Sequence, residues 1–373
     1  MKGRGAKPRA RQTKLQSALD SPQSGRCKRS GSLAADGELG RTECKPMSLG
    51  NRRSQNETSV SYFKEGTKSR FLAGLSSLLS FIASFTLPLY AAGTNGAESL
   101  LAGIGARPSA LGGAYTALAN DPLALAYNPS GLARIKRPML SLMHSEWLEG
   151  SQMQFAALAL PSKAGVLGLS FYRMDMGQFT GRDSAGRLSD DFSAGDLAVS
   201  LGMARQIHPR ILAGFKLSYF QESLAGYKAA TYFGDFGIML AANKKLTFGA
   251  AIQNAGPGLR FINEVSKLPL TYALGAGFNL GGIRLAADYK MRPGEKSHEL
   301  AAGVELAPAA GESSGRPLAL RLGYHGLESA GASALGGLGA GFGLALGAIG
   351  LDYSFQPFGL LGNAHRMNLT IKF

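Results

Sequence analysis

Six charged residues in the second half of the chain are spaced so that they could pair with one another inside a barrel. They are Arg284, Asp288, Glu299, Glu305, Arg321 and Asp352. Arg284 and Asp288 are an even number of residues apart, which places both on one face of a strand. Neighbouring strands bring opposite charges within reach, and an enclosed ion without a partner is costly. We therefore expect a lumen ion network, with separate surface ions as the alternative.

No group of residues has the spacing that catalysis or metal binding needs. The five histidines are scattered and lack metal-ligand spacing. Serines in glycine-containing stretches lack the strand, elbow and helix of a hydrolase. Both cysteines, Cys27 and Cys44, precede the predicted export signal, so the exported part has no thiol. The sequence therefore predicts no enzyme, metal or cofactor; a barrel-borne enzyme is the alternative.

Short segments of two-residue alternation, separated by turn residues, follow one another from Pro138 onward. The clearest is 196–204, where Leu197, Val199 and Leu201 share one face. Fourteen such segments are expected near 138–147, 151–160, 164–173, 194–206, 210–221, 230–241, 245–254, 269–280, 282–291, 297–306, 317–325, 335–346, 348–356 and 364–373. An even count and lengths near those of tilted spanning strands are typical of an outer-membrane barrel.

The composition of the two faces decides between a soluble sandwich and a membrane barrel. The polar face is mostly Gly, Ala, Ser and Thr, with few ions. Strands exposed to water usually carry more Lys and Glu, partly as protection against edge pairing. In a membrane barrel the apolar face meets lipid and the small or polar face lines the lumen. The sequence thus predicts an all-β fold, a transmembrane antiparallel barrel; a soluble β-sandwich is the alternative.

The positive charge of the chain is concentrated before the predicted barrel. Residues 1–91 contain 16 Lys and Arg against 6 Asp and Glu, a net of +10, whereas residues 92–373 contain 24 against 19, a net of +5. This removes the argument for a nucleic-acid partner. We predict a polar basic leader at 1–67, a signal peptide at 68–92, a hatch at 93–137 and the barrel at 138–373. A membrane anchor in place of the signal, and a start at Met47, are alternatives.

The last ten residues alternate strictly and end on Phe373. A terminal phenylalanine that closes an amphipathic strand resembles the C-terminal signal of outer-membrane proteins. This resemblance implies that the barrel-assembly machinery is a partner and that Phe373 belongs to its recognition signal.

Residues 103–133 carry a distinctive motif. The stretch GARPSALGGAYTALAND at 105–121 is followed by ALAYNPSGLA at 124–133. The Ala-rich residues 109–119 predict a short helix, with Ser109 as N-cap. Asn128, Pro129, Ser130 and Gly131 predict a turn with asparagine side-chain bonding to the backbone. A glycine-rich linker is the alternative for 103–113.

This motif is similar to the N-terminal motif of FadL-like and PorV/PorQ-like outer-membrane proteins. The resemblance implies a barrel of about fourteen strands plugged by a small hatch, with Asn128, Pro129, Ser130 and Gly131 in the hatch turn. It implies passive outer-membrane transport of hydrophobic compounds, with long-chain fatty acids expected. Expected partners are this ligand and outer-membrane lipid, in a diderm bacterium. The alternative is a PorV-like docking partner in protein secretion or surface attachment.

Overall fold

The computed structural model describes residues 95–307, 318–326 and 337–373. The predicted leader at 1–67 and signal peptide at 68–92 lie outside the described residues. Within these ranges, no helix has both the length and the apolar character to cross a membrane.

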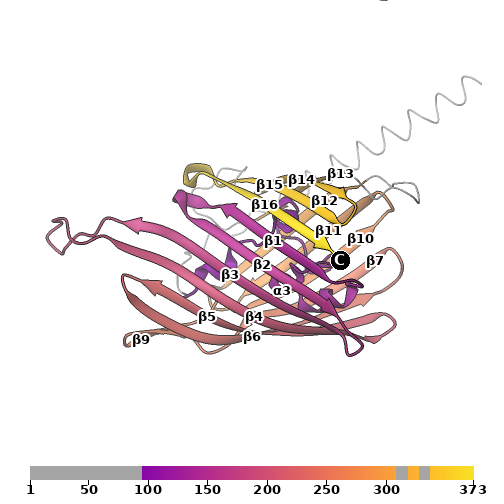
Figure 1. Ribbon diagram of the computed structural model, residues 1–373, viewed down its shortest axis with the longest axis horizontal. Helices are drawn as coiled ribbons and strands as arrows, with labels where there is room; N and C mark the ends of the chain where they lie inside the picture. Colours follow the sequence, from indigo (N-terminus) through magenta and orange to yellow (C-terminus); the bar gives the residue numbers. More distant parts are fainter. Residues whose placement is uncertain (1–94, 308–317, 327–336) are drawn as a thin grey trace, which may run out of the picture. The chain divides into compact units, whose positions relative to one another are not determined.

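Fourteen strands in the described parts of the chain form one closed barrel, in which all neighbours are antiparallel (Figure 1). Their bounds lie within a few residues of the predicted ones. They are β1 Met139–Glu146, β2 Gln152–Pro161, β3 Val166–Phe179, β4 Phe192–His208, β5 Ile211–Leu224, β6 Tyr227–Ala241, β7 Leu246–Ala255, β10 Thr271–Asn279, β11 Ile283–Arg292, β12 Ser297–Leu306, β13 Leu318–His325, β14 Leu338–Leu346, β15 Ile349–Pro357 and β16 Asn363–Lys372. Pairing of β16 with β1 closes the barrel.

Two further strands had no counterpart in the sequence analysis. β8 Leu259–Phe261 and β9 Glu264–Ser266 form a separate hairpin between β7 and β10. Each has three residues, too short for a two-residue alternation to stand out.

The outward face of the barrel is apolar, as the residue pattern predicts. Leu201 on β4 is 60% exposed and Leu274 on β10 is 58% exposed. Their inward neighbours are small, as with Ser200 and Gly275. A closed sheet satisfies its backbone hydrogen bonds internally, and lipid solvates an apolar outer surface. The chain is therefore a transmembrane barrel of the outer-membrane type.

The two ends of the barrel differ in the length of their connections. At one end, here called the loop end, the described connections include 147–151, 180–191 and 256–270. At the other, the turn end, most are short, such as 162–165 and 209–210, and the connection 307–317 between β12 and β13 is the exception. Outer-membrane barrels have short periplasmic turns and longer extracellular loops. The loop end therefore faces the exterior of the cell.

The segment before β1, here called the hatch segment (residues 95–137), folds inside the barrel. Its short helices are η1 Glu98–Leu101, α2 Ala106–Ala110, α3 Ala124–Tyr127 and η2 Pro129–Arg134. Two shorter 3-10 turns, η3 Leu148–Gly150 and η4 Gly359–Leu361, lie in connections at the loop end. The hatch segment contacts strands around the barrel, including β5 through η2 and β15 through α2.

The predicted helix at 109–119 is wrong. The helix α2 ends at Ala110, and Ser109 lies inside it, with Gly105 at the N-cap position. Gly112 and Gly113 follow with φ of 65° and 80°, which no continuing right-handed helix accommodates. The glycines therefore end the helix and turn the chain toward the wall.

Leu201→Arg tests the assignment of the outer face. It should destabilise the barrel in lipid vesicles by about 2–4 kcal/mol, because an arginine near the middle of the bilayer must leave water. Urea unfolding followed by the heat-dependent shift in gel mobility measures the change, with Leu201→Ala as the control. Equal stability of the two variants would contradict a lipid-facing Leu201.

Candidate functional site

The hatch segment lies directly against glycines of the inner wall. A Cβ at Gly214 on β5 would stand 2.7 Å from the carbonyl carbon of Pro129. A Cβ at Gly249 on β7 would stand 2.5 Å from the carbonyl oxygen of Thr116. The inward glycines at which a Cβ would stand less than 3.0 Å from a hatch atom are here called the glycine track: Gly168, Gly202, Gly214, Gly237, Gly249, Gly275, Gly277, Gly303, Gly323, Gly339 and Gly341. Any side chain at these positions would push the hatch segment off the wall.

Asn128 is the polar centre of the hatch turn and is fully buried. Its Nδ2 donates to the carbonyl oxygens of Thr116 at 2.9 Å and Ile238 at 3.3 Å. Its Oδ1 accepts from the Ser130 backbone N–H at 3.2 Å and the Ser130 hydroxyl at 2.7 Å. One side chain thus joins two parts of the hatch segment to the wall strand β6. Asn128 also caps η2, where Pro129 takes the first position, and Gly131 packs on Ala119.

Glu305 on β12 binds the hatch segment through an ion pair. Its side chain is 1% exposed, and it accepts from Arg107 Nε of the hatch segment at 2.8 Å. It also accepts from Arg321 Nε at 2.8 Å and from Arg284. Arg321 in turn donates to Asp352 at 2.7 Å. Four of the six expected lumen ions are therefore adjacent, and Arg107 connects them to the hatch segment.

The other two expected lumen ions lie elsewhere. Asp288 accepts from the backbone N–H groups of Tyr115 at 2.9 Å and Thr116 at 2.8 Å, so it binds hatch backbone. Glu299 pairs with Lys290 at 3.0 Å and Arg292 at 2.5 Å.

Sequence reasoning missed Arg107, Lys290 and Arg292 as network members, and it also missed the buried pair of Lys216 with Asp235 at 2.5 Å. The even spacing of Lys290 and Arg292 from Asp288 could have identified those two.

Asp121 carries a further polar contact within the hatch segment. Burial raises the pKa of the Asp121 carboxyl, and the nearby Arg107 guanidinium and Tyr115 hydroxyl partly offset this. The Tyr115 hydroxyl donates to Asp121 at 2.6 Å. These contacts fix Arg107 from the hatch side while Glu305 holds it from the wall.

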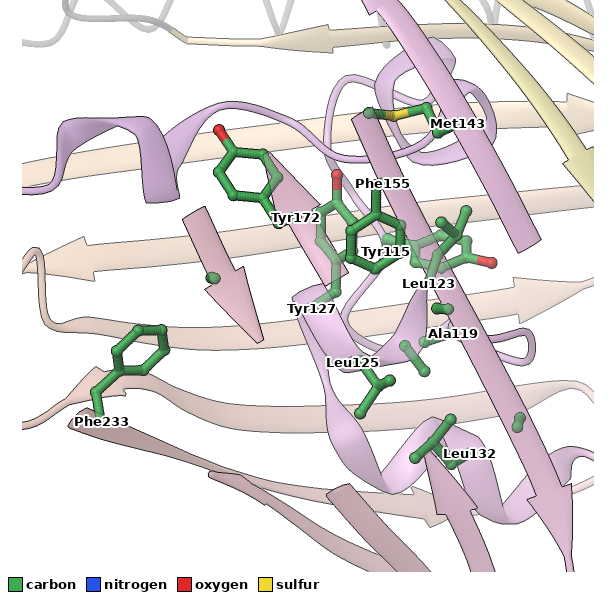
Figure 2. Close-up of a cluster of buried hydrophobic side chains, with 14 of the residues drawn as sticks. Tyr115, Ala119, Leu123, Leu125, Tyr127, Leu132, Met143, Phe155, Tyr172 and Phe233 are labelled. Carbon is green, nitrogen blue, oxygen red and sulfur yellow. The ribbon is translucent and has the colours of Figure 1, made fainter. Parts of the chain in front are cut away.

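A cavity of about 520 Å³ lies between the hatch segment and the loop end. It is lined by Phe155 and Tyr172 of the wall and by Tyr127 and Leu125 of the hatch segment, which belong to one cluster of buried apolar side chains (Figure 2). Further apolar lining comes from Leu100, Leu101, Ile104, Trp147, Met174, Met176, Phe233 and Phe358. The remaining lining includes the ionisable groups Lys290, Arg292, Glu299 and Arg366. The cavity therefore offers both an apolar surface and charge.

The final strand ends at the turn end. The backbone N–H of Phe373 donates to the carbonyl oxygen of Pro138 at 2.9 Å, and the side chain is 65% exposed. Its role as an assembly signal stays a prediction. Among the residues that the structure describes, no group of three or more His, Cys, Asp or Glu could hold a metal ion.

Comparison with known proteins supports the fold. Residues 90–263 match an uncharacterised protein family, UPF0164. No curated protein matches the sequence. Among solved structures, the CymD monoaromatic hydrocarbon channel superposes with a TM-score of 0.53 at 14% identity, over 73% of this chain and 98% of that one.

Two further structures agree. The toluene transporter TodX of P. putida gives a TM-score of 0.51 at 13% identity, covering 73% of this chain and 99% of TodX. A Pseudomonas aeruginosa FadL homologue gives 0.50 at 10% identity, covering 77% and 100%. The chain thus has the fold of the FadL and TodX barrels, which confirms at the level of fold the resemblance seen in residues 103–133.

Glu305→Gln should loosen the hatch segment. Removing one charge leaves three arginines around a buried neutral side chain, and breaking a buried ion pair in this way costs about 3–5 kcal/mol. Faster hydrogen exchange of residues 105–121, together with a lower urea midpoint, is the expected result. Asp183→Asn, which removes the exposed pair with Arg187, is the control and should change neither. Unchanged exchange in Glu305→Gln would contradict the role of the pair.

The glycine track is tested by Gly214→Ala against Gly234→Ala. At Gly214 the added methyl meets hatch backbone, and overpacking of this kind costs about 1–3 kcal/mol. At Gly234 the nearest atom stands at an ordinary 3.5 Å, so the variant should be as stable as the parent or more so. Unfolding free energies in vesicles measure both. If Gly214→Ala were the more stable variant, the close approach would not exist.

Proposed function

We propose that the protein is a passive channel for hydrophobic compounds in the outer membrane, with long-chain fatty acids as its cargo. The observation that carries the proposal is the cavity at the loop end of the hatch segment, whose wall at Phe155, Tyr172 and Met174 is apolar. Pockets for small ligands are mostly apolar, with a few placed polar groups. A cavity of about 520 Å³ lies in the usual size range for such pockets.

The names of proteins with a similar fold also support a channel for hydrophobic compounds. The printed names of two of them describe a monoaromatic hydrocarbon channel and a toluene transporter. Both names describe hydrophobic cargo, and this chain shares the fold of those two proteins. Long-chain fatty acids are the cargo that the resemblance of residues 103–133 implies.

The hatch segment separates the cavity from the turn end, so cargo must wait for it to shift. Asn128, Glu305 and Asp288 each attach a different part of the hatch segment to the wall. Cargo in the cavity would contact Tyr127, which directly precedes Asn128, and Leu125, which lies on the same short helix. Cargo that binds the shifted arrangement more tightly than the closed one moves the equilibrium between them. Passage then follows the concentration gradient without chemistry.

Uptake by proteoliposomes tests the proposal. The protein should give saturable uptake of labelled palmitate above empty liposomes, and Asn128→Ala should raise the rate several-fold because it releases the hatch turn. Asn243→Ala is the matched control, since Asn243 makes similar side-chain bonds to the backbone in an exposed turn. Uptake no greater than that of empty liposomes would contradict the proposed function.

Docking of exported proteins is the second candidate function. Apolar side chains in the connections at the loop end are strongly exposed, with Leu360 at 98%, Ile262 at 70% and Leu188 at 70%. Exposed apolar patches often mark protein interfaces. Stoichiometric recovery of an exported protein with the detergent-extracted barrel would favour docking, whereas co-purifying lipid would favour the channel.

A further inference from the structure

We propose that Arg366 is the residue that binds the carboxylate of an amphipathic ligand in the cavity. This inference rests on the proposed channel function and adds the residue that would bind the anionic head of such a ligand. It depends on two observations: one nitrogen of the buried Arg366 guanidinium has no hydrogen-bond partner, and the residue lines the cavity.

Arg366 lies on β16, lines the cavity and is fully buried. Its Nε donates to the carbonyl oxygen of Gly103 at 2.9 Å, and its Nη1 donates to Gln356 Oε1 at 3.0 Å. Its Nη2 is buried without a hydrogen-bond partner. Within the described ranges, no carboxylate lies within ion-pair distance of this side chain, and its contacts are to neutral groups.

Three other arginines inside the barrel provide a contrast. Arg107, Arg292 and Arg321 each form an ion pair with a carboxylate. Burying a cation without a counter-ion is costly, and a guanidinium binds carboxylates through parallel N–H groups. Arg366 can therefore still bind a carboxylate, whereas the other three arginines already do so.

One edge of the guanidinium has the geometry to bind a carboxylate. Nε and Nη2 form one fork, in which Nε is occupied by a neutral carbonyl and Nη2 by nothing. A carboxylate that replaces the Gly103 carbonyl would bind both. Ser109 Oγ, also buried without a partner, adds a third donor: it and Nη2 stand 3.2 Å and 3.6 Å from the point where a Cβ of residue 103 would lie. The absence of a side chain at Gly103 leaves these groups uncovered.

The apolar surface begins beside this site. The Arg366 guanidinium stacks on the Trp147 ring at 4.5 Å. β16 pairs with β1, and β1 continues through β2 to β3, so Phe155 and Tyr172 lie on the neighbouring strands of the wall. A head group at Arg366 would therefore place its chain along Phe155, Tyr172 and Met174. Displacement of Gly103 would at the same time disturb the hatch segment.

The test compares an acid with an alcohol of equal chain length. Trp147 is the one tryptophan of the sequence, so its fluorescence reports binding at the site. The folded protein in non-ionic detergent is titrated at pH 8 with decanoate and with decan-1-ol. Charge-assisted hydrogen bonds contribute about 1.5–3 kcal/mol, so decanoate should bind about 10- to 100-fold more tightly. This comparison needs no variant.

Two variants locate the effect. Arg366→Gln removes the charge, and Gly103→Ala covers Nη2 and Ser109 Oγ with a methyl group. Both should lower the preference for the acid at least five-fold and change the alcohol affinity less than two-fold. Lys290→Gln tests a rival cation of the cavity lining. Arg187→Gln, which removes an exposed cation outside that lining, is the control and should keep the preference.

Equal wild-type affinities for acid and alcohol would overturn the assignment of Arg366 and leave the channel proposal standing. Loss of the preference in Lys290→Gln but not in Arg366→Gln would also overturn it. Binding of neither ligand would count against the channel function itself.

Discussion

The hatch backbone touches the barrel wall along a track of inward glycines, and most of the site depends on this close approach. Gly214 and Gly237 receive the Asn128 turn, while Gly303 and Gly323 receive the chain around Leu111. Close packing of backbone on backbone lets wall and hatch share hydrogen bonds, such as the one from Asn128 to Ile238. The hatch segment does not fill the space between itself and the loop end, and this space is the cavity. The glycines of this track therefore reflect a packing requirement inside the barrel.

Two buried carboxylates of the wall, Glu305 and Asp288, bind the hatch segment. Glu305 holds Arg107, and Asp288 holds the backbone at Tyr115 and Thr116. Removing one partner of a buried ion pair costs about 3–5 kcal/mol of stability. A charged or polar group of the cargo could replace the lost partner. This makes ion pairs suitable for a plug that must stay closed without cargo. Arg366 differs from Glu305 because it has no charged partner among the described residues; it donates to the Gly103 carbonyl of the hatch segment and also lines the cavity.

Barrel architecture was predictable from the sequence because lipid and lumen impose opposite requirements on alternate residues. Leu197, Val199 and Leu201 could face lipid only if Ala198 and Ser200 faced the lumen, which fixed the strand and its orientation. Helix α2 was misplaced because composition favours a helix through the alanines, whereas Gly112 and Gly113 end it with positive φ. The hatch partners of Asp288 and Glu305 could not be predicted either. Both bind the hatch segment, and alternation within a strand carries no information about a segment more than a hundred residues away.

The central claim is that cargo passes only when the hatch segment moves, and a reversible lock tests it most directly. A Cβ at Gly277 would stand 3.6 Å from the Ala117 Cβ, within the usual range for a disulfide. Ala117→Cys combined with Gly277→Cys therefore joins the hatch segment to β10, in a chain whose Cys27 and Cys44 are replaced by serine. Palmitate uptake by proteoliposomes should stop when the pair is oxidised and return on reduction. Undiminished uptake by fully oxidised protein would contradict the account.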